Sequence, residues 1–216
     1  MQLALNLLGI AVVIAICWLI SWQRKSINWK LIGKALVIQF LLAVFIVKVP
    51  LGQQIVSLLS DAVSTIVNCG RDGVSFVFGD LADTSKMFVF CIASLGNIIF
   101  VSGLVELMYY LGVLGFVVKW LGRLIKKVVG STEVESFIAT ANMFLGQTSS
   151  PVLISKYIGR MTDSEVLVIL VAGMGSMDVS VLTAYVSMGI PMEYLLMASM
   201  LVPVGSILIA KMILPE

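Results

Sequence analysis

Long apolar runs alternate with short polar segments along this chain. Residues 3–22 carry no charge, and the run ends in Trp18 and Trp22 before Arg24 and Lys25. A helix of roughly 20 apolar residues crosses a bilayer, and tryptophans and cations suit its interfacial end. Comparable runs occupy residues 31–49, 97–118, 166–190 and 194–210. The pattern therefore predicts five transmembrane helices.

Two further segments have amphipathic patterns. Residues 51–67 place apolar side chains at helical spacing with polar ones between them, which predicts a helix lying at the outer membrane interface. We expect the glycines of "GRDGVSFVFGD", residues 70–80, to end this helix. Residues 118–129, "VKWLGRLIKKVV", predict a basic surface helix that anchors to lipid headgroups.

Charge is scarce and unevenly distributed. Hydrophobic residues make up 60% of the chain and charged residues 12%, far from the composition of a soluble domain. The cations gather in alternate loops: Arg24, Lys25, Lys30 and Lys34; Lys119, Arg123, Lys126 and Lys127; Lys156 and Arg160; and Lys211. By the positive-inside rule these loops face the cytoplasm and the N-terminus lies outside. The net charge of +2 thus reflects membrane topology, and we expect no nucleic-acid partner.

An apolar stretch with a polar centre, "ATANMFLGQTSSPVLISKY", occupies residues 139–157. The basic flanks on both sides require residues 134–157 to enter and leave the membrane on the same side, which predicts a re-entrant helical hairpin. Gly146 permits the turn, and Pro151 favours the start of the returning half-helix. The alternative is a kinked span with serine and threonine back-bonding, but that would break the charge pattern. Half-helix ends at mid-depth are where transporters bind substrates and ions.

Enzyme chemistry has no support in the sequence. Cys17, Cys69 and Cys91 lack paired spacing, and the chain contains no histidine. Nucleotide-binding glycine loops and a serine nucleophile elbow are also missing from it. We therefore expect a protein that is not an enzyme and holds no organic cofactor.

Four passages together resemble one family. They are "GRDGVSFVFG" at 70–79, "YYLGV" at 109–113, "ANMFLGQTSSP" at 141–151 and "TAYVSMGIPMEYLLMASMLVPVGSILIAKMILPE" at 183–216. The chain resembles the N-terminal half of a concentrative nucleoside transporter of the bacterial sodium- or proton-coupled type. The resemblance implies an all-α protein of the bacterial inner membrane, a homotrimer, with one repeat of an inverted-repeat fold. It implies two peripheral helices in 1–50, an outer interfacial helix and loop in 51–95, and the first transport repeat in 96–216.

The resemblance also implies which residues form the site. Gln147 and Thr148 match positions that contact the nucleobase, and Val181 matches an apolar residue of the base pocket. The sodium site is matched by Asn142, the carbonyl of Leu145, Ser176 and the carbonyl of Met177.

The sequence departs from the family at functional positions. Ser149 stands where the family pattern Gly-Gln-Thr-Glu-Ala-Pro has a glutamate that helps bind the nucleoside, and Asp178 stands where the family is small and apolar. Ionisable groups within spans are costly and usually functional. One hypothesis makes Asp178 a cation ligand or a protonatable coupling group; the other makes it a neutral, buried acid bonded to hairpin hydroxyls. We expect Glu106 near a subunit or hairpin contact.

The chain reaches Glu216, about half the family length. It would then be a truncation, a half that pairs with a separately encoded second half, or a half that pairs with itself. Self-pairing in inverted orientation would need a weak charge bias, whereas the asymmetry of the basic residues here is strong. The function implied is cation-coupled nucleoside uptake, either alone or as an N-terminal half-subunit. The alternative is a non-transporting structural or regulatory membrane protein derived from the same fold.

Overall fold

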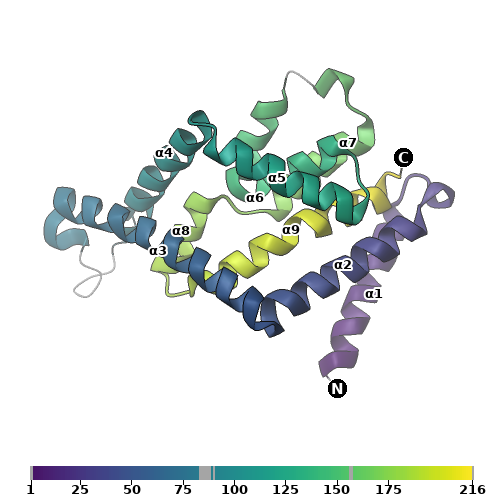
Figure 1. The fold of residues 1–216 in the computed structure, drawn as a ribbon, viewed down its shortest axis with the longest axis horizontal. Helices are drawn as coiled ribbons and strands as arrows, with labels where there is room; N and C mark the ends of the chain where they lie inside the picture. The colour runs from purple at the N-terminus through teal and green to yellow at the C-terminus, as the bar shows by residue number, and fades with distance from the viewer. Residues whose placement is uncertain (1, 83–88, 90, 156–157, 216) are drawn as a thin grey trace.

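The computed structural model describes residues 2–82, 89, 91–155 and 158–215, without the side chains of 2–4, 6, 7 and 148–154. The regular structure within these residues is entirely helical (Figure 1). Besides the main helices, short helical turns occupy Arg24–Ser26, Gly79–Ala82 and Ile158–Arg160. The predicted all-α class is confirmed.

Each predicted span corresponds to one helix or to two consecutive helical segments. The first is α1 (Gln2–Ile20) and the second is α2 (Trp29–Lys48); the third joins a π-helical turn at Cys91–Leu95 to α4 (Gly96–Tyr110). The fourth consists of α7 (Asp163–Gly175) and α8 (Val179–Ser187), and the fifth is α9 (Met192–Ile213). By length and apolarity, 4 of these stretches among the described residues, the second to the fifth, can cross a membrane. In α1, Leu8–Ile20 forms a shorter apolar helix.

Several predicted boundaries were wrong. The third span begins at Cys91 and ends at Tyr110 rather than lying within 97–118. Gly112 separates it from the basic helix α5 (Val113–Val129), which therefore begins five residues before the predicted 118. The fifth span, predicted as 194–210, is 22 residues long and reaches Ile213, because apolar residues continue past Lys211.

The outer helix was also predicted too short. α3 runs from Pro50 to Phe78 and does not end at Gly70 or Gly73. Gly70 lies against α4, where a Cβ would collide with the Asn97 side-chain oxygen. This glycine permits close packing of two helices, and the tertiary contact outweighs its low helix propensity of about 1 kcal/mol.

The helix ends meet in two groups at opposite ends of the structure. In one group, the Trp22 amide donates to the Ile213 carbonyl at 3.0 Å, and the Ser164 hydroxyl donates to the Leu214 carbonyl at 2.9 Å. In the other group, the hydroxyls of Ser94 and Ser187 lie 2.8 Å apart. Each group joins ends that the charge pattern assigned to one side of the membrane.

The main core surrounds α9, which lies beside α2 in Figure 1. Small buried residues such as Ala35, Ala139 and Ala172 let α2, α6 (Glu133–Ile154) and α7 approach it closely. Large apolar side chains such as Phe40, Ile99 and Phe116 are exposed on the outside. An apolar exterior around a core of small residues is typical of helices packed within lipid.

Candidate functional site

The segments that flank the predicted hairpin lie together, while residues 156 and 157 at its predicted end lie outside the described part of the chain. The hydroxyl of Thr132, just before α6, donates to a carboxylate oxygen of Glu165 in α7 at 3.2 Å. From Glu133 to Leu145 the helix carries the chain roughly 18 Å away at 1.5 Å per residue. The part after Gly146 must therefore return for Glu165 to reach Thr132. The re-entrant hairpin is confirmed, and a single kinked span does not fit.

Matching caps begin both helices at this base. At α6 the Thr132 amide donates to Glu135 at 3.0 Å, and the Glu135 amide donates to the Thr132 hydroxyl at 3.2 Å. At α7, Thr162 and Glu165 form the same reciprocal pair. Each pair is a capping box, which satisfies amides that the first helical turn leaves without partners. Because Thr132 takes part in one box and bonds to Glu165 in the other, the boxes join the hairpin to α7.

The hairpin tip contacts a break in the fourth span. Gly146 leaves helical geometry with φ 67° and ψ −172°, and a Cβ there would lie 2.9 Å from the Cβ of Asp178. The hydropathy pattern predicted a continuous fourth span, but α7 ends at Gly175 and α8 begins at Val179. On the adjoining turn, a Cβ at Gly173 would lie 3.4 Å from the Cβ of Gln147. Two helix interruptions thus face each other.

Helix C-termini, which carry partial negative charge, and a helix N-terminus, which carries partial positive charge, meet at this contact. The first half of α6 and the whole of α7 end at the contact, and the partial negative charge of a helix C-terminus favours cations. The N-terminus of α8 begins at the same place and favours negative groups. Broken helices with this geometry form the ion and substrate sites of secondary transporters.

Neutral oxygens predominate at the predicted cation site. Asn142 is fully buried; its amide nitrogen donates to the Ile169 carbonyl at 3.4 Å, and its oxygen is 3.9 Å from where a Gly173 Cβ would lie. The Ser176 hydroxyl donates to the Gly173 carbonyl at 3.3 Å. No group of three histidines, cysteines or acids that could hold a metal ion occurs among the described residues. Amide, hydroxyl and carbonyl oxygens at helix C-termini fit a sodium ion.

The remaining predicted ligands of the ion offer backbone oxygens. The Leu145 side chain is buried against Leu114 and Val118 of α5, which leaves its carbonyl as the predicted ligand. The Met177 side chain is 46% exposed, and its carbonyl, the predicted ligand, belongs to the break itself.

The predicted substrate residues are only partly described. Gln147 is exposed at the hairpin tip, beside Gly173, and Val181 is 39% exposed in the first turn of α8. The side chains of Thr148 and Ser149 lie outside the described part of the chain.

Asp178 begins α8. One of its carboxylate oxygens accepts from the Ser180 amide at 3.0 Å, which caps the helix. The side chain is partly exposed, so the hypothesis of a buried acid does not fit in that respect. Its predicted hydroxyl partners lie among side chains that the structure does not describe. Glu106 is exposed on α4, and its predicted contact remains a prediction.

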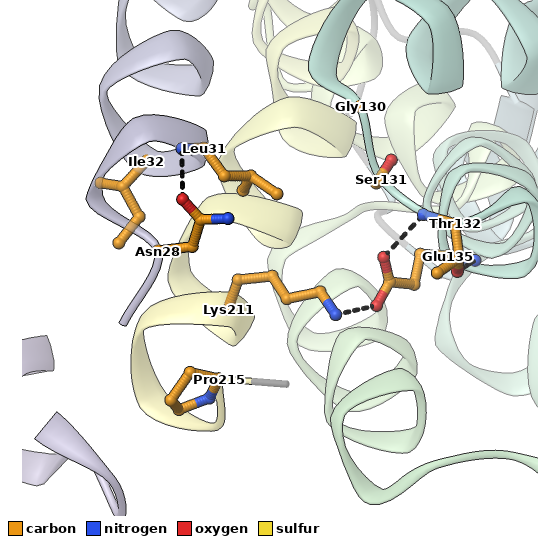
Figure 2. A pocket seen from close by; sticks show the side chains of 9 residues that line it. All are labelled: Asn28, Leu31, Ile32, Gly130, Ser131, Thr132, Glu135, Lys211 and Pro215. Atoms are coloured by element: carbon orange, nitrogen blue, oxygen red, sulfur yellow. Dashed lines mark hydrogen bonds and ion pairs between the residues drawn. The ribbon is translucent and has the colours of Figure 1, made fainter. Parts of the chain in front are cut away.

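Sequence reasoning missed an ion pair near the hairpin base. Lys211 of α9 lies 2.6 Å from a carboxylate oxygen of the fully buried Glu135 (Figure 2). The pair borders a cavity of about 180 Å³ whose other lining residues are Asn28, Leu31, Ile32, Gly130, Ser131, Thr132 and Pro215. The Thr-x-x-Glu spacing at 132–135 signals the cap, but nothing local links Glu135 to a residue 76 positions away.

The fold and the site define a class of protein. A re-entrant hairpin facing a broken span, within a set of apolar helices, is one repeat of a secondary transporter. Two family models match the chain: the N-terminus of Na+ dependent nucleoside transporters over residues 8–81, and a nucleoside recognition (Gate) model over residues 91–192.

Individual relatives agree with these models. An uncharacterized transporter of Haemophilus influenzae is 41% identical over 100% of this chain and 52% of its own length. The nucleoside permease NupC of Helicobacter pylori is 36% identical over 98% of this chain and 52% of its own length. The structure of CNTnw in an inward-facing substrate-bound state superimposes with a TM-score of 0.94, at 38% identity, over 100% of this chain and 54% of that one.

The chain belongs to the concentrative nucleoside transporter family and corresponds to the N-terminal half of its members. It spans about half the length of the curated relatives it matches. These relatives include permeases, which agrees with the expectation that the chain is not an enzyme.

Proposed function

We propose that this chain supplies the N-terminal half of a cation-coupled nucleoside uptake system. The observation that carries the proposal is the contact between the Gly146 turn and the break at 176–178. It brings an exposed amide, Gln147, beside the buried amide Asn142 and the ends of three helices. Such a junction provides neighbouring places for a polar substrate and a cation.

In this proposal the two ligands have separate residues. Gln147 and Thr148 bind the nucleobase, Ser149 provides a weaker contact where the family has an acid, and Val181 lines the base pocket. Asn142 and Ser176, with the carbonyls of Leu145 and Met177, hold sodium. The helix C-termini at the junction would stabilise the charge of a bound cation, and the hairpin tip, which contributes to both sites, would couple its binding to that of the nucleoside.

Asp178 is the proposed coupling acid. It is covalently next to Met177 and packs on Gly146, so its charge lies beside both the cation site and the hairpin tip. One carboxylate oxygen caps α8, and among the described residues the other accepts no hydrogen bond. A carboxylate there compensates for the acid that Ser149 replaces. If sodium is the coupling ion, nucleoside binding in the experiment below requires sodium; if a proton is, binding requires acidic pH.

The proposed system includes a second inverted repeat. A nucleoside site enclosed on both sides requires a second inverted repeat, carried by the same polypeptide or by a separate chain. We propose a homotrimer in the bacterial inner membrane with its N-terminus outside. Within it, residues 1–50 form peripheral helices, 51–95 the outer interfacial segment and 96–216 the first transport repeat.

Calorimetry of the purified full-length protein, as it is encoded, tests the function. We expect nucleoside binding that requires sodium or acidic pH and that Asn142→Ala abolishes. Asn68→Ala, on the exposed side of α3, is the matched control and should bind normally. Asp178→Asn should reduce the dependence on the coupling ion. A folded sample that binds no nucleoside under any ionic condition would favour the non-transporting alternative.

A further inference from the structure

The ion pair of Glu135 and Lys211 connects the hairpin to the central helix. Glu135 lies in the first turn of α6, and Lys211 lies in the last turn of α9. The Glu135 side chain is 0% exposed and that of Lys211 only 10%. Each charge also suits its helix end, since acids are favoured near N-termini and cations near C-termini.

The cavity around the pair lies where three segments converge. Figure 2 shows Asn28, the N-cap residue of α2, and Leu31 of α2 on one side, Ser131 and Thr132 before α6 on the other, and Lys211 reaching between them to Glu135. The second carboxylate oxygen of Glu135 accepts from the Thr132 amide at 3.0 Å. Both oxygens of Glu135 therefore have a partner, one in the cap before its own helix and one in α9.

Glu135 shares a helix face with the proposed cation ligand. Asn142 follows it by seven residues, which is two turns of an α-helix and about 10.5 Å along the axis. Between them, Ala139 packs into the core formed with α9. A rotation of this half-helix about its axis would therefore move Glu135 away from Lys211 and Asn142 away from α7 at the same time.

We propose that Glu135 and Lys211 are positioning residues, which set the rotation of the first hairpin half-helix and thereby aim Asn142 at α7. The inference rests on the proposed function for its consequence in binding, but its structural part can be tested separately. A buried pair contributes orientation more than net stability, because desolvation offsets much of the attraction. Loss of one partner leaves an uncompensated buried charge, whereas loss of both removes the constraint without that cost.

Amide hydrogen exchange over residues 139–145 tests the pair in three variants of the full-length protein. We expect Glu135→Gln, which keeps the capping box, and Lys211→Met each to lower Tm and to speed exchange by about tenfold or more. The Glu135→Gln, Lys211→Met double variant should recover Tm while exchange stays fast. Sodium-dependent nucleoside affinity should fall in all three variants.

Glu133→Gln is the matched control. Its carboxylate bonds to Lys126 at 3.0 Å, but this pair is exposed, and hydrogen bonding to Lys126 lowers the pKa of the Glu133 carboxyl. Exchange over 139–145 should stay at the wild-type rate in this variant. Wild-type exchange in the double variant, or equally fast exchange in Glu133→Gln, would overturn the proposal. If the wild-type protein binds no nucleoside, the proposed function fails, while the exchange comparison still decides the role of the pair.

Discussion

Asp178 combines two roles that substitution can separate. Its carboxylate caps α8, and loss of an N-cap costs about 1 kcal/mol, whereas asparagine caps nearly as well as aspartate. We expect Asp178→Ala to lower the unfolding temperature and Asp178→Asn to leave it nearly unchanged, as thermal unfolding in detergent would measure. Ion dependence should change in both variants. If Asp178→Asn destabilises the protein as much as Asp178→Ala does, the charge contributes to stability and the two roles cannot be separated.

Gly70 is a residue whose missing side chain lets two helices touch. A Cβ there would overlap the side-chain oxygen of Asn97 and reach the Phe100 ring at 2.7 Å. Gly70→Ala should therefore destabilise the contact of α3 with α4 by about 1–3 kcal/mol, despite the better helix propensity of alanine. Gly73→Ala, where a Cβ would meet nothing within 4 Å, is the control and should be neutral or stabilising. Equal unfolding temperatures for the two variants would contradict this account.

At the scale of elements, the hairpin depends on the turn at Gly146. Its φ of 67° is costly for any residue with a Cβ, and that Cβ would also collide with Asp178. We expect Gly146→Ala to lower stability by about 1–3 kcal/mol and to abolish nucleoside binding, as calorimetry and thermal unfolding would show. Gly33→Ala, in an open position of α2, should change neither. Normal binding by Gly146→Ala would mean that the tip tolerates another backbone conformation.

The sequence predicted elements better than their ends and contacts. Apolar runs and alternating basic loops predicted the spans and the hairpin, because length and charge reflect the bilayer directly. The end of α3 was predicted wrongly because Gly70 serves close packing against Asn97, which lies on another helix, and does not end the helix. The break after Gly175 was missed because glycine and serine are common within transmembrane helices, which left Asp178 as the one charged residue beside it.

The candidate site was predictable only through family resemblance. No local pattern assigns a cation to Asn142 or Ser176, since single amides and hydroxyls recur throughout apolar helices. The structure adds that these residues meet through the Gly146 turn and the broken span. The Glu135–Lys211 pair depends on tertiary contact alone, because neither residue predicts the other.

At the scale of the whole molecule, the helix ends form two groups, and each group is predicted to lie on one side of the membrane. Lys127, in the last turn of α5, belongs with the basic loops, and Glu193 begins α9 at the opposite end. In a background without Cys17, Cys69 and Cys91, we expect Glu193→Cys to react with an impermeant maleimide added to intact cells. Lys127→Cys should react only after the membrane is opened.

Both predictions follow from the positive-inside rule. They also use the re-entrant hairpin, which does not cross the membrane and therefore leaves residues 127 and 156 on the same side. Labelling of Lys127→Cys in intact cells would invert the topology and place the N-terminus inside, while labelling of both variants would indicate two orientations. If Glu193→Cys reacts in intact cells and Lys127→Cys does not, the base of the hairpin faces the cytoplasm, and the Glu135–Lys211 pair lies on that side of the membrane.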